Sequence, residues 1–184
     1  MLLLNAINEV LPKLGEHPVT STESKSPTLA VVIPQIEATT RNLLTAGWWF
    51  NTFNITLYPD SEKYIGVPLN TLKWIPEPGV SCIARGERFY NGDTQSFKFD
   101  GPVKGVVTQL VSFEELPESV AQAVLYTALV IIYATDIGLE EVVRIWQGLA
   151  TAGMARMEAE HLENKRYSIR QSRRFRNLLS AMRG

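Results

Sequence analysis

The stretch Gly47-Trp48-Trp49-Phe50-Asn51 marks the place where the pattern of this 184-residue chain changes. Before it, apolar residues recur three and four positions apart, which predicts helices. After it, apolar and polar residues alternate and β-branched or aromatic residues become frequent, which predicts strands. A glycine after a helical pattern is a helix stop, and the aromatic residues that follow it are expected to cover the helices where a sheet begins.

Two helices are expected before this boundary. The first has an apolar stripe at Leu3, Ile7, Val10, Leu11 and Leu14. Because Pro12 lies inside that pattern, the last turn should be distorted or the helix should end near Leu11. Residues 20–27 are polar and rich in Ser and Thr, so they are expected to form a loop. The second helix, with Pro27 in its first turn, should run to Ala46 and stop at Gly47.

Short strands are expected between residues 48 and 111. Residues 81–85 and 88–90 indicate two short strands around Gly86, and residues 103–111 indicate one more. Asn91-Gly92 is a turn signal that precedes Phe97-Lys98-Phe99. Several short segments with turn signals between them favour a small antiparallel sheet.

The helical pattern returns at Phe113-Glu114-Glu115-Leu116-Pro117. Ser112 and Glu115 have the spacing of a capping box, so Ser112 is expected to cap the free amides of a helix that begins here or just after Pro117. This helix is apolar around most of its circumference, which predicts a central, buried element. It should end near Gly138.

A last, long helix is expected after Leu139. Its inner stripe is predicted to contain Val142, Val143, Ile145, Trp146, Leu149, Met154 and Met157. Gly148 and Gly153 should weaken it locally.

The order of elements predicts an α+β fold, a mainly α-helical bundle interrupted by a small antiparallel β-rich insertion and ending in a long C-terminal helix. We expect residues 1–47 and 112–164 to form the helical domain and residues 48–111 to form the inserted β-rich subdomain. Residues 165–184 are expected to form a basic C-terminal arm or helix end.

Charge is distributed unevenly along the chain. The last twenty residues carry seven cations and no acid, so the other 164 residues hold eleven basic and nineteen acidic side chains and a net charge of −8. A basic arm on an acidic body indicates a partner with an acidic surface, either phosphate or carboxylate. The alternative is a solvated helix end whose cations interact favourably with the helix dipole.

The composition is that of an ordinary globular protein, with 45% hydrophobic and 20% charged residues. We expect no signal peptide, because the amino terminus lacks a basic leader, and no membrane span, because the apolar run at 128–133 is short. One cysteine, Cys82, and two histidines, His17 and His161, provide neither a disulfide nor a set of zinc ligands. We expect Cys82 to be a buried strand residue, and no cofactor or metal to be bound.

No pattern for an enzyme is convincing. Phosphate-cradling glycine loops, nucleophile elbows and paired metal-binding histidines do not occur. Glu114 and Glu115 could suggest a hydrolase, but neighbours on a helix diverge by about 100 degrees. Glu16 and His17 are expected to be exposed loop residues without a third catalytic partner. Stacking of the aromatics at 47–51 on nucleobases is disfavoured, because residues 47–60 contain no Arg or Lys.

Four patterns occur in a fixed order along the chain. They are Ala6-Ile7-Asn8 leading into Leu14-Gly15-Glu16-His17-Pro18-Val19, then Gly47-Trp48-Trp49-Phe50-Asn51, then Leu57-Tyr58-Pro59-Asp60, then Phe113-Glu114-Glu115-Leu116-Pro117. From about residue 5 to about residue 140, the chain resembles the tail tubular protein A family, the head-to-tail adaptors or gatekeepers of short-tailed bacteriophages. Their order and spacing carry the resemblance, since each pattern alone is only a turn, a cap or an aromatic cluster.

The resemblance implies a virion structural protein of the tail or neck that is made in the host cytoplasm and is not an enzyme. Its family fold is helical with an inserted β-region, and its members assemble as a twelve-subunit ring between the portal protein and the tail nozzle protein. Genomic double-stranded DNA would pass through that ring.

In this chain the basic segment is the expected portal contact. The residues assigned to it are Lys165, Arg166, Arg170, Arg173, Arg174 and Arg176. The β-rich insertion is expected to contact the next tail component. Two alternatives stay open: a nucleic-acid-binding protein that uses the Arg-rich C-terminus, and a tail-associated glycan hydrolase that uses Glu16, Glu114 or Glu115.

Overall fold

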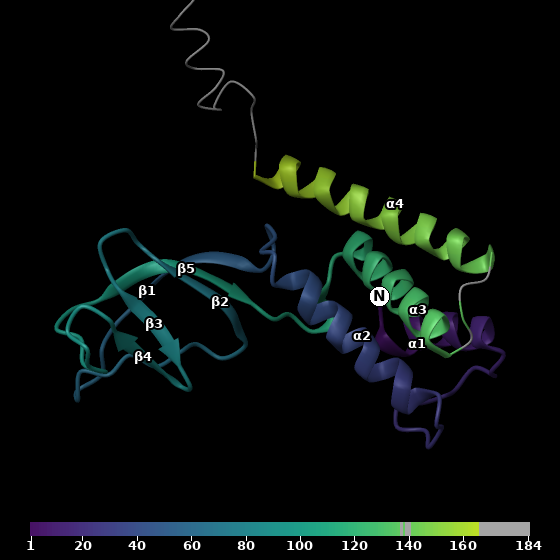
Figure 1. Ribbon diagram of the computed structural model, residues 1–184, viewed down its shortest axis with the longest axis horizontal. Helices are drawn as coiled ribbons and strands as arrows, with labels where there is room; N and C mark the ends of the chain where they lie inside the picture. The colour runs from purple at the N-terminus through teal and green to yellow at the C-terminus, as the bar shows by residue number, and fades with distance from the viewer. Residues whose placement is uncertain (137, 139–140, 166–184) are drawn as a thin grey trace, which may run out of the picture.

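The computed structural model describes residues 1–136, 138 and 141–165. Helices lie at one end of an elongated molecule and strands at the other (Figure 1). The elements are α1 (Leu3–Val10), η1 (Leu11–Leu14), α2 (Leu29–Leu44), β1 (Thr52–Leu57), β2 (Thr71–Pro76), β3 (Cys82–Arg85), β4 (Arg88–Asn91), β5 (Val103–Gln109), η2 (Phe113–Glu115), α3 (Glu118–Asp136) and α4 (Glu141–Asn164). The predicted α+β class with a long C-terminal helix is confirmed. The division into helical and inserted domains at residues 47 and 112 stays a prediction.

Helix α3 is the centre of the helical part. It packs against α4 on one side and against α2 on the other, with α1 close by (Figure 1). Val120, Val124 and Leu129 of α3 are all at most 1% exposed. The prediction of a central helix that is apolar around most of its circumference is therefore confirmed.

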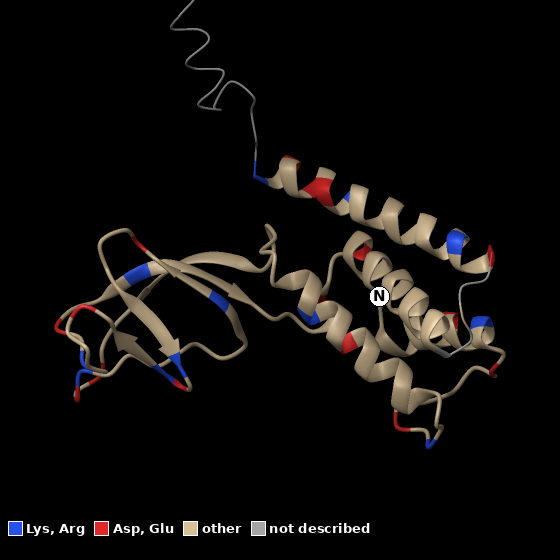
Figure 2. Ribbon diagram, in the orientation of Figure 1, with Lys and Arg blue, Asp and Glu red and all other residues tan. Residues whose placement is uncertain are grey.

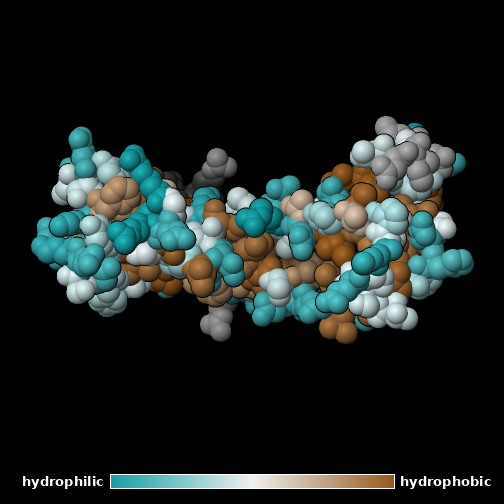
Figure 3. Space-filling view, turned by 90° about the horizontal axis from the view of Figure 1, so that it is seen from below, coloured by the Kyte–Doolittle hydropathy of each residue, from teal (hydrophilic) through white to brown (hydrophobic). Residues whose placement is uncertain are grey.

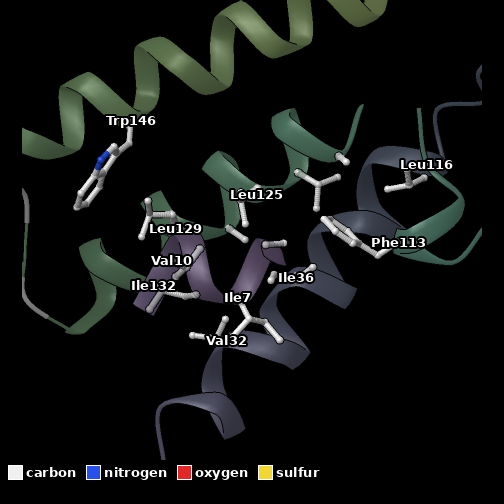
Figure 4. Packing of buried hydrophobic residues seen from close by; sticks show 14 of the residues in the cluster. Ile7, Val10, Val32, Ile36, Phe113, Leu116, Leu125, Leu129, Ile132 and Trp146 are labelled. Atoms are coloured by element: carbon white, nitrogen blue, oxygen red, sulfur yellow. The ribbon is translucent and has the colours of Figure 1, made fainter. Parts of the chain in front are cut away.

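The helical core draws side chains from every helix. Figure 4 shows Ile7 and Val10 of α1, Val32 and Ile36 of α2, Leu125, Leu129 and Ile132 of α3, and Trp146 of α4, together with Phe113 and Leu116. Burial of one such side chain contributes about 1.5–3 kcal/mol. Apolar burial is therefore the main source of stability for this part of the molecule.

The first helix changes character at Pro12, as predicted. Helix α1 ends at Val10, and the stripe continues as the 3-10 turn η1. Gly15 follows in the left-handed conformation with φ 82°, which ends the turn. The polar stretch at 20–27 is a loop, also as predicted.

The second helix is shorter than expected. It begins at Leu29 and ends at Leu44, so Pro27 lies before its first turn and Ala46 lies beyond its end. Gly47 has φ 86° and is the predicted stop. A left-handed glycine after the last turn is typical of helix ends because it lacks the Cβ that would clash.

The strands form a three-stranded antiparallel sheet of order β1-β5-β2, with β3 and β4 as a separate hairpin. Gly105 of β5 lies opposite Ile55 of β1 and Pro76 of β2. An added Cβ at Gly105 would lie 2.5 Å from the Ile75 carbonyl oxygen and 2.6 Å from the Trp74 ring. Glycine is needed there because the indole of Trp74 lies against the middle strand.

The predicted strands at 81–85, 88–90 and 103–111 are confirmed to within two residues at each end. The stretch Phe97-Lys98-Phe99 forms no regular strand. Only an isolated bridge joins Lys98 to Tyr64. Phe99 is buried in the second hydrophobic cluster with Ile65 and Phe89, so packing rather than strand pairing holds this segment.

The expected cap at Ser112 is wrong. Residues 113–115 form a short 3-10 turn, and α3 begins at Glu118, so the predicted start just after Pro117 is confirmed. The Ser112 hydroxyl donates to the Glu115 carboxylate at 2.9 Å and makes no side-chain bond to the free amides. The side chains of Ser112 and Glu115 bind each other and not the backbone amides, because Leu116 is extended at ψ 143° and interrupts the helix.

The inner face of α4 differs from the prediction at two positions. Val143, Trp146 and Met157 are buried as expected, but Ile145 is 62% exposed and Leu149 is 43% exposed. Gly153 is buried, and an added Cβ there would lie 3.0 Å from the backbone of Ala123. Close packing of α4 on α3 therefore requires this glycine.

The expectation of no membrane span stays a prediction, because the short apolar run at 128–133 on which it rested lies inside a longer apolar stretch. Within the described residues, Glu118–Thr135 of α3 is long and apolar enough by length and composition. Slightly more than half of that stretch is buried inside the protein. Its apolar surface is used in packing between α2 and α4, as expected for the core helix of a globular domain.

Candidate interaction surfaces

The junction between the helices and the sheet is organised by Asn51. Its side chain is fully buried, and three of its hydrogen bonds are 3.0 Å or shorter. Its oxygen accepts from the Trp48 amide at 2.7 Å, and its nitrogen donates to the Leu44 carbonyl at 3.0 Å and to the Gln109 carbonyl at 2.8 Å. Leu44 is the last residue of α2 and Gln109 the last of β5, so Asn51 ties the two parts together.

The aromatic residues at the junction also receive the C-terminal end of α4. His161 packs against Trp48 with ring centroids 5.3 Å apart, and against Trp49 at 6.1 Å. The Trp48 indole donates to the Leu43 carbonyl at 2.8 Å. The predicted role of this aromatic stretch, a helix stop with a hydrophobic cover where the sheet begins, is confirmed.

His161 is the titratable group of this junction. Burial lowers its pKa, and the positive charge of Lys165 lowers it further. Its Nδ1 is buried and has no hydrogen-bond partner among the described atoms. The neutral imidazole is therefore the form that suits the site.

The pattern around residues 6–19 has a structural explanation. The Asn8 side-chain nitrogen donates to the Val19 carbonyl at 2.9 Å, and the Val19 amide donates to the Asn8 side-chain oxygen at 2.8 Å. Asn8 thus holds the extended segment that leaves η1 against α1. Glu16 and His17 between them are exposed, as expected.

An apolar groove runs along α2. Its volume is about 980 Å³, and its walls are α2, the start of α1, the loop at 20–22 and the linker from Leu110 to Glu114. Ile36 and Phe113 are buried residues of its lining, and Glu37, Arg41 and Glu114 supply its charges. Hydrophobic surface covers the middle of the molecule, where the helical and strand parts meet (Figure 3). No pattern in the sequence predicted this groove, because its walls come from segments that are far apart along the chain.

A second apolar surface lies on the side of α4 that faces away from α3. It contains Ile145, Leu149 and Leu162, which are 62%, 43% and 51% exposed. The small residues Gly148, Ala152, Ala155 and Ala159 lie exposed on the same side of the helix. We call this surface the α4 ridge. The sequence contains a signal for this surface, since the apolar residues of α4 do not fall on one side of the helix only.

Charged residues cluster at the far end of the strand part (Figure 2). Lys63 and Asp100 form an exposed ion pair with 2.7 Å between nitrogen and oxygen. The Arg85 guanidinium lies 3.8 Å from the ring centre of Tyr90, and that of Arg88 lies 4.2 Å from Tyr64. This end of the insertion is polar and suits a hydrated contact.

Only Lys165 of the predicted portal-binding residues lies in the described part of the chain. It is exposed at the end of α4, and its amide donates to the His161 carbonyl at 3.0 Å. The other five residues, Arg166, Arg170, Arg173, Arg174 and Arg176, lie outside the described residues.

The three carboxylates considered for hydrolysis do not form one site. Glu16 accepts from the Thr28 hydroxyl at 3.2 Å, Glu114 from the Leu3 amide at 3.3 Å, and Glu115 from Ser112. Each therefore has a local structural partner. Within residues 1–136, 138 and 141–165, no cluster of three or more His, Cys, Asp or Glu could hold a metal ion.

Cys82 is buried at the start of β3, as predicted. Burial raises the pKa of its thiol, and the neighbouring Trp74 side chain opposes that rise in part. The Trp74 indole N–H nevertheless lacks a partner of good hydrogen-bond geometry among the described atoms. A thiol with a raised pKa is a poor nucleophile, so Cys82 is a packing residue.

Comparison with known proteins assigns the family. A family model described as "Tail tubular protein" matches residues 4–167. The chain is also similar to a protein named "Tail tubular protein A" from Klebsiella phage KP34, with 29% identity over 179 residues. That alignment covers 97% of this chain and 96% of the relative. Because the family model spans most of the sequence, the chain belongs to the tail tubular protein family.

Proposed function

We propose that this tail tubular protein, a structural component of a bacteriophage tail, is the head-to-tail connector that forms a ring between portal and nozzle. The observation that carries the proposal is the match over nearly the whole chain to a tail tubular protein A. The four ordered sequence patterns agree with the same adaptor type. Asn8, Val19, Gly47 and Asn51 of those patterns are all structural residues, as a shared architecture requires.

The charge of the body suits a channel through which DNA moves. Residues 1–164 carry a net charge of −8. Basic surfaces bind the phosphates of DNA through counterion release, whereas an acidic surface does not. A ring built from this body would let genomic DNA pass without holding it.

The basic C-terminal segment is the proposed contact with the portal. Lys165 stands exposed where α4 ends, and five further arginines assigned to the contact follow it in sequence. A cationic segment can bind an acidic protein surface through charge-assisted hydrogen bonds. The strand part, with its polar far end, would then contact the next tail component.

Light scattering after size exclusion tests this proposal. The full chain, alone and mixed with the assembled portal of the same phage, is compared with a variant that ends at Asn164. A full-length variant with glutamine at the six predicted contact positions controls for chain length. Stacking of this protein on the portal, lost in both variants, is expected. Stacking that persists in both variants would show that the basic segment is not the contact with the portal. No association of the full chain with the portal would contradict the connector role.

A second candidate function is nucleic-acid binding, favoured by the same seven cations. Phosphate contacts make the affinity fall steeply as salt rises, with a logarithmic slope of about −0.9 per contact. Duplex DNA titrations over a salt series, with the full chain and the six-glutamine variant, separate the two functions. Strong, salt-dependent binding that disappears in the variant would favour the DNA function. Indifference to DNA at physiological salt would eliminate it.

We infer that the role is not enzymatic. Glu16, Glu114 and Glu115 each have a local partner and come from different segments. Zymography on cell-wall glycan compares the parent protein with three variants in which each of these residues is replaced singly by Gln. The parent protein is expected to show no activity. Activity that one of these replacements abolished would restore the hydrolase alternative.

A further inference from the structure

Two arginines face each other across the hairpin of β3 and β4, in the part of the molecule away from the helices (Figure 1). Arg85 and Arg88 are direct partners in this ladder, on either side of the turn at Gly86 and Glu87, and both are exposed. Residues directly opposite each other share one face of a sheet, and like charges in that arrangement are destabilising. The hairpin therefore carries two cations on one face, at a cost that a bound anion would remove.

Each guanidinium group lies against a tyrosine ring. The Arg85 guanidinium lies 3.8 Å from the ring centre of Tyr90, and the Arg88 guanidinium lies 4.2 Å from that of Tyr64. A ring covers one flat face of a guanidinium group, while the N–H groups at its edge stay available for a planar anion. The two arginines are held in place before a ligand arrives, which lowers the entropic cost of binding.

A cavity of about 310 Å³ lies beside one of these arginines. Its lining consists of Tyr64, Arg88, Ser96, Phe97 and Lys98, so it contains two cations and no acid. An isolated bridge pairs Lys98 with Tyr64, which places Lys98 on the same side as the ring that holds Arg88. Phe97 is 39% exposed. The cavity thus combines positive charge with exposed aromatic carbon, which suits an anion that is attached to an apolar group.

Most acidic side chains of the strand part have a local role. Asp100 pairs with Lys63, the Asp60 carboxylate accepts from the amides of its own loop, Asp93 accepts from the Ser81 amide, and Glu77 lines a different cavity with Lys104. Glu62 and Glu87 are exposed. Among the described residues, the ion pairs of the folded protein include none of Arg85, Arg88 and Lys98. These three cations are therefore available to a ligand, with Glu87 in the hairpin turn as the nearest competitor in sequence.

The charge of the strand part favours a protein ligand over DNA. Residues 52–109 contain six basic and six acidic side chains, so this part is neutral as a whole. Proteins bind duplex DNA through a broad basic surface and many phosphate contacts. Three cations on a neutral body do not provide such a surface. Carboxylates on a protein segment, with an apolar side chain that covers Phe97, match both the charge and the aromatic lining of the cavity.

We propose that the face formed by Arg85, Arg88 and Lys98, together with Tyr64, Tyr90 and Phe97, binds the carboxylates of an acidic segment of another virion protein. We call it the arginine face. A guanidinium group binds a carboxylate through two parallel hydrogen bonds, which adds geometric specificity to the charge attraction. The inference rests on the proposed function for the place of the partner, the next tail component, and adds the chemistry of the surface that meets this chain.

An NMR titration of the full chain tests this binding. The probe is a synthetic peptide, blocked at both ends, in which glutamate and valine alternate, and its counterpart has glutamine in place of glutamate. The glutamate peptide is expected to shift the amide signals of β4 and of residues 96–98. The glutamine peptide should bind about tenfold more weakly, because it lacks the charge-assisted hydrogen bonds. Equal binding of the two peptides, or no shift with either, would overturn the inference.

Substitutions on the arginine face separate geometry from general charge. Arg88→Gln should weaken binding of the glutamate peptide about tenfold, and Arg88→Lys about threefold, because lysine keeps the charge but not the planar group that lies on Tyr64. Glu87→Gln should strengthen binding, because it removes the competing carboxylate. Lys73→Gln, at an exposed position of β2 outside this cavity, is the matched control. Equal losses in Arg88→Gln and Lys73→Gln would show general charge attraction and overturn the inference.

Two further measurements make the result decisive. Circular dichroism melts check the fold of each variant, and Arg85→Gln replaces Arg88→Gln if the latter unfolds. Duplex DNA that shifts the same amides at physiological salt, and binds more tightly than the glutamate peptide, would overturn the inference in favour of a nucleic-acid ligand.

The portal mixture used to test the connector role is scored separately. Stacking on the portal without peptide binding would overturn this inference and leave the connector role in place. Peptide binding without stacking would leave this inference in place while the connector role failed.

Discussion

The helical part and the strand part of this molecule are stabilised in different ways. Among the described residues, the helical core contains twenty buried hydrophobic residues, while the cluster of the strand part contains five. The strand part relies more on ladder hydrogen bonds and on the fit of Trp74 against Gly105. Since apolar burial is the dominant favourable term in folding, the helices should form the stable body, and the insertion should be the part that a local change can alter.

The largest expected effect comes from the helical core. Leu129→Ala removes a side chain that is 0% exposed and should lower the free energy of unfolding by about 2 to 5 kcal/mol. Ile145→Ala, on the exposed ridge, should change it by about 0.5 kcal/mol or less. Chemical denaturation followed by circular dichroism measures both. Similar losses at the two positions would mean that the helical core is not the main source of stability.

The junction should come next. Asn51→Ala leaves the Leu44 and Gln109 carbonyls and the Trp48 amide without their partner, at a cost of about 1 to 3 kcal/mol. Hydrogen exchange should show faster opening of both the end of α2 and the end of β5. Asn54→Ala, exposed on β1, is the control. If hydrogen exchange became faster only at the end of α2 or only at the end of β5, Asn51 would stabilise that element alone.

A change confined to the strand part should have a smaller effect on the helices. Gly105→Ala places a Cβ against Ile75 and Trp74 and should cost about 1 to 3 kcal/mol through overpacking. Gly101→Ala, where an added Cβ meets nothing within 4 Å, is the matched control. Proteolysis with trypsin should cut the strand part of Gly105→Ala faster while α3 stays protected. Equal cutting in both variants would show that the Trp74 contact is not needed.

The smallest expected effect is a pH dependence from His161. Its pKa is lowered in the folded protein, chiefly by burial. In the window between the folded and the unfolded pKa, the unfolded state binds more protons, so stability decreases as pH falls from the ordinary value of about 6.5 toward the folded pKa. His161→Phe should keep the contact with Trp48 and flatten this dependence. If the free energy of unfolding depended on pH equally in His161→Phe and in the parent, the dependence would come from other titratable groups.

Sequence-based predictions were confirmed where the physical cause lies in the backbone of the residue itself, and some failed where it lies in the surroundings. Pro12 ends α1 and Gly47 ends α2, as predicted, because both act through their own backbone geometry. The Ser112 cap was wrong, because an extended Leu116 and Pro117 delay the helix to Glu118. The inner position of Ile145 was wrong for another reason. A helix with apolar residues on two sides does not indicate which side faces the core.

The candidate surfaces could be anticipated only in part. The charge split and the basic C-terminal segment were evident from composition, whereas Asn8 and Asn51 stood only as members of the ordered patterns, with no role predicted for either. Their partners, Val19 for Asn8 and Gln109 for Asn51, lie 11 and 58 residues away. The groove joins α1, α2, a loop and a linker, so no single stretch of sequence carries its signal.

Local periodicity and short ordered motifs were enough to predict the order of helices and strands, the breaks at Pro12 and Gly47, and the family. The packed molecule was needed to show that α3 lies between α4 and α2, that Ile145 and Leu149 face outward, and that a groove opens along α2. Burial depends on neighbours that are close in space but distant in the sequence, so periodicity within one helix does not reveal it. Each helix covers one side of another, and the sides left uncovered appear only when all of them are in place.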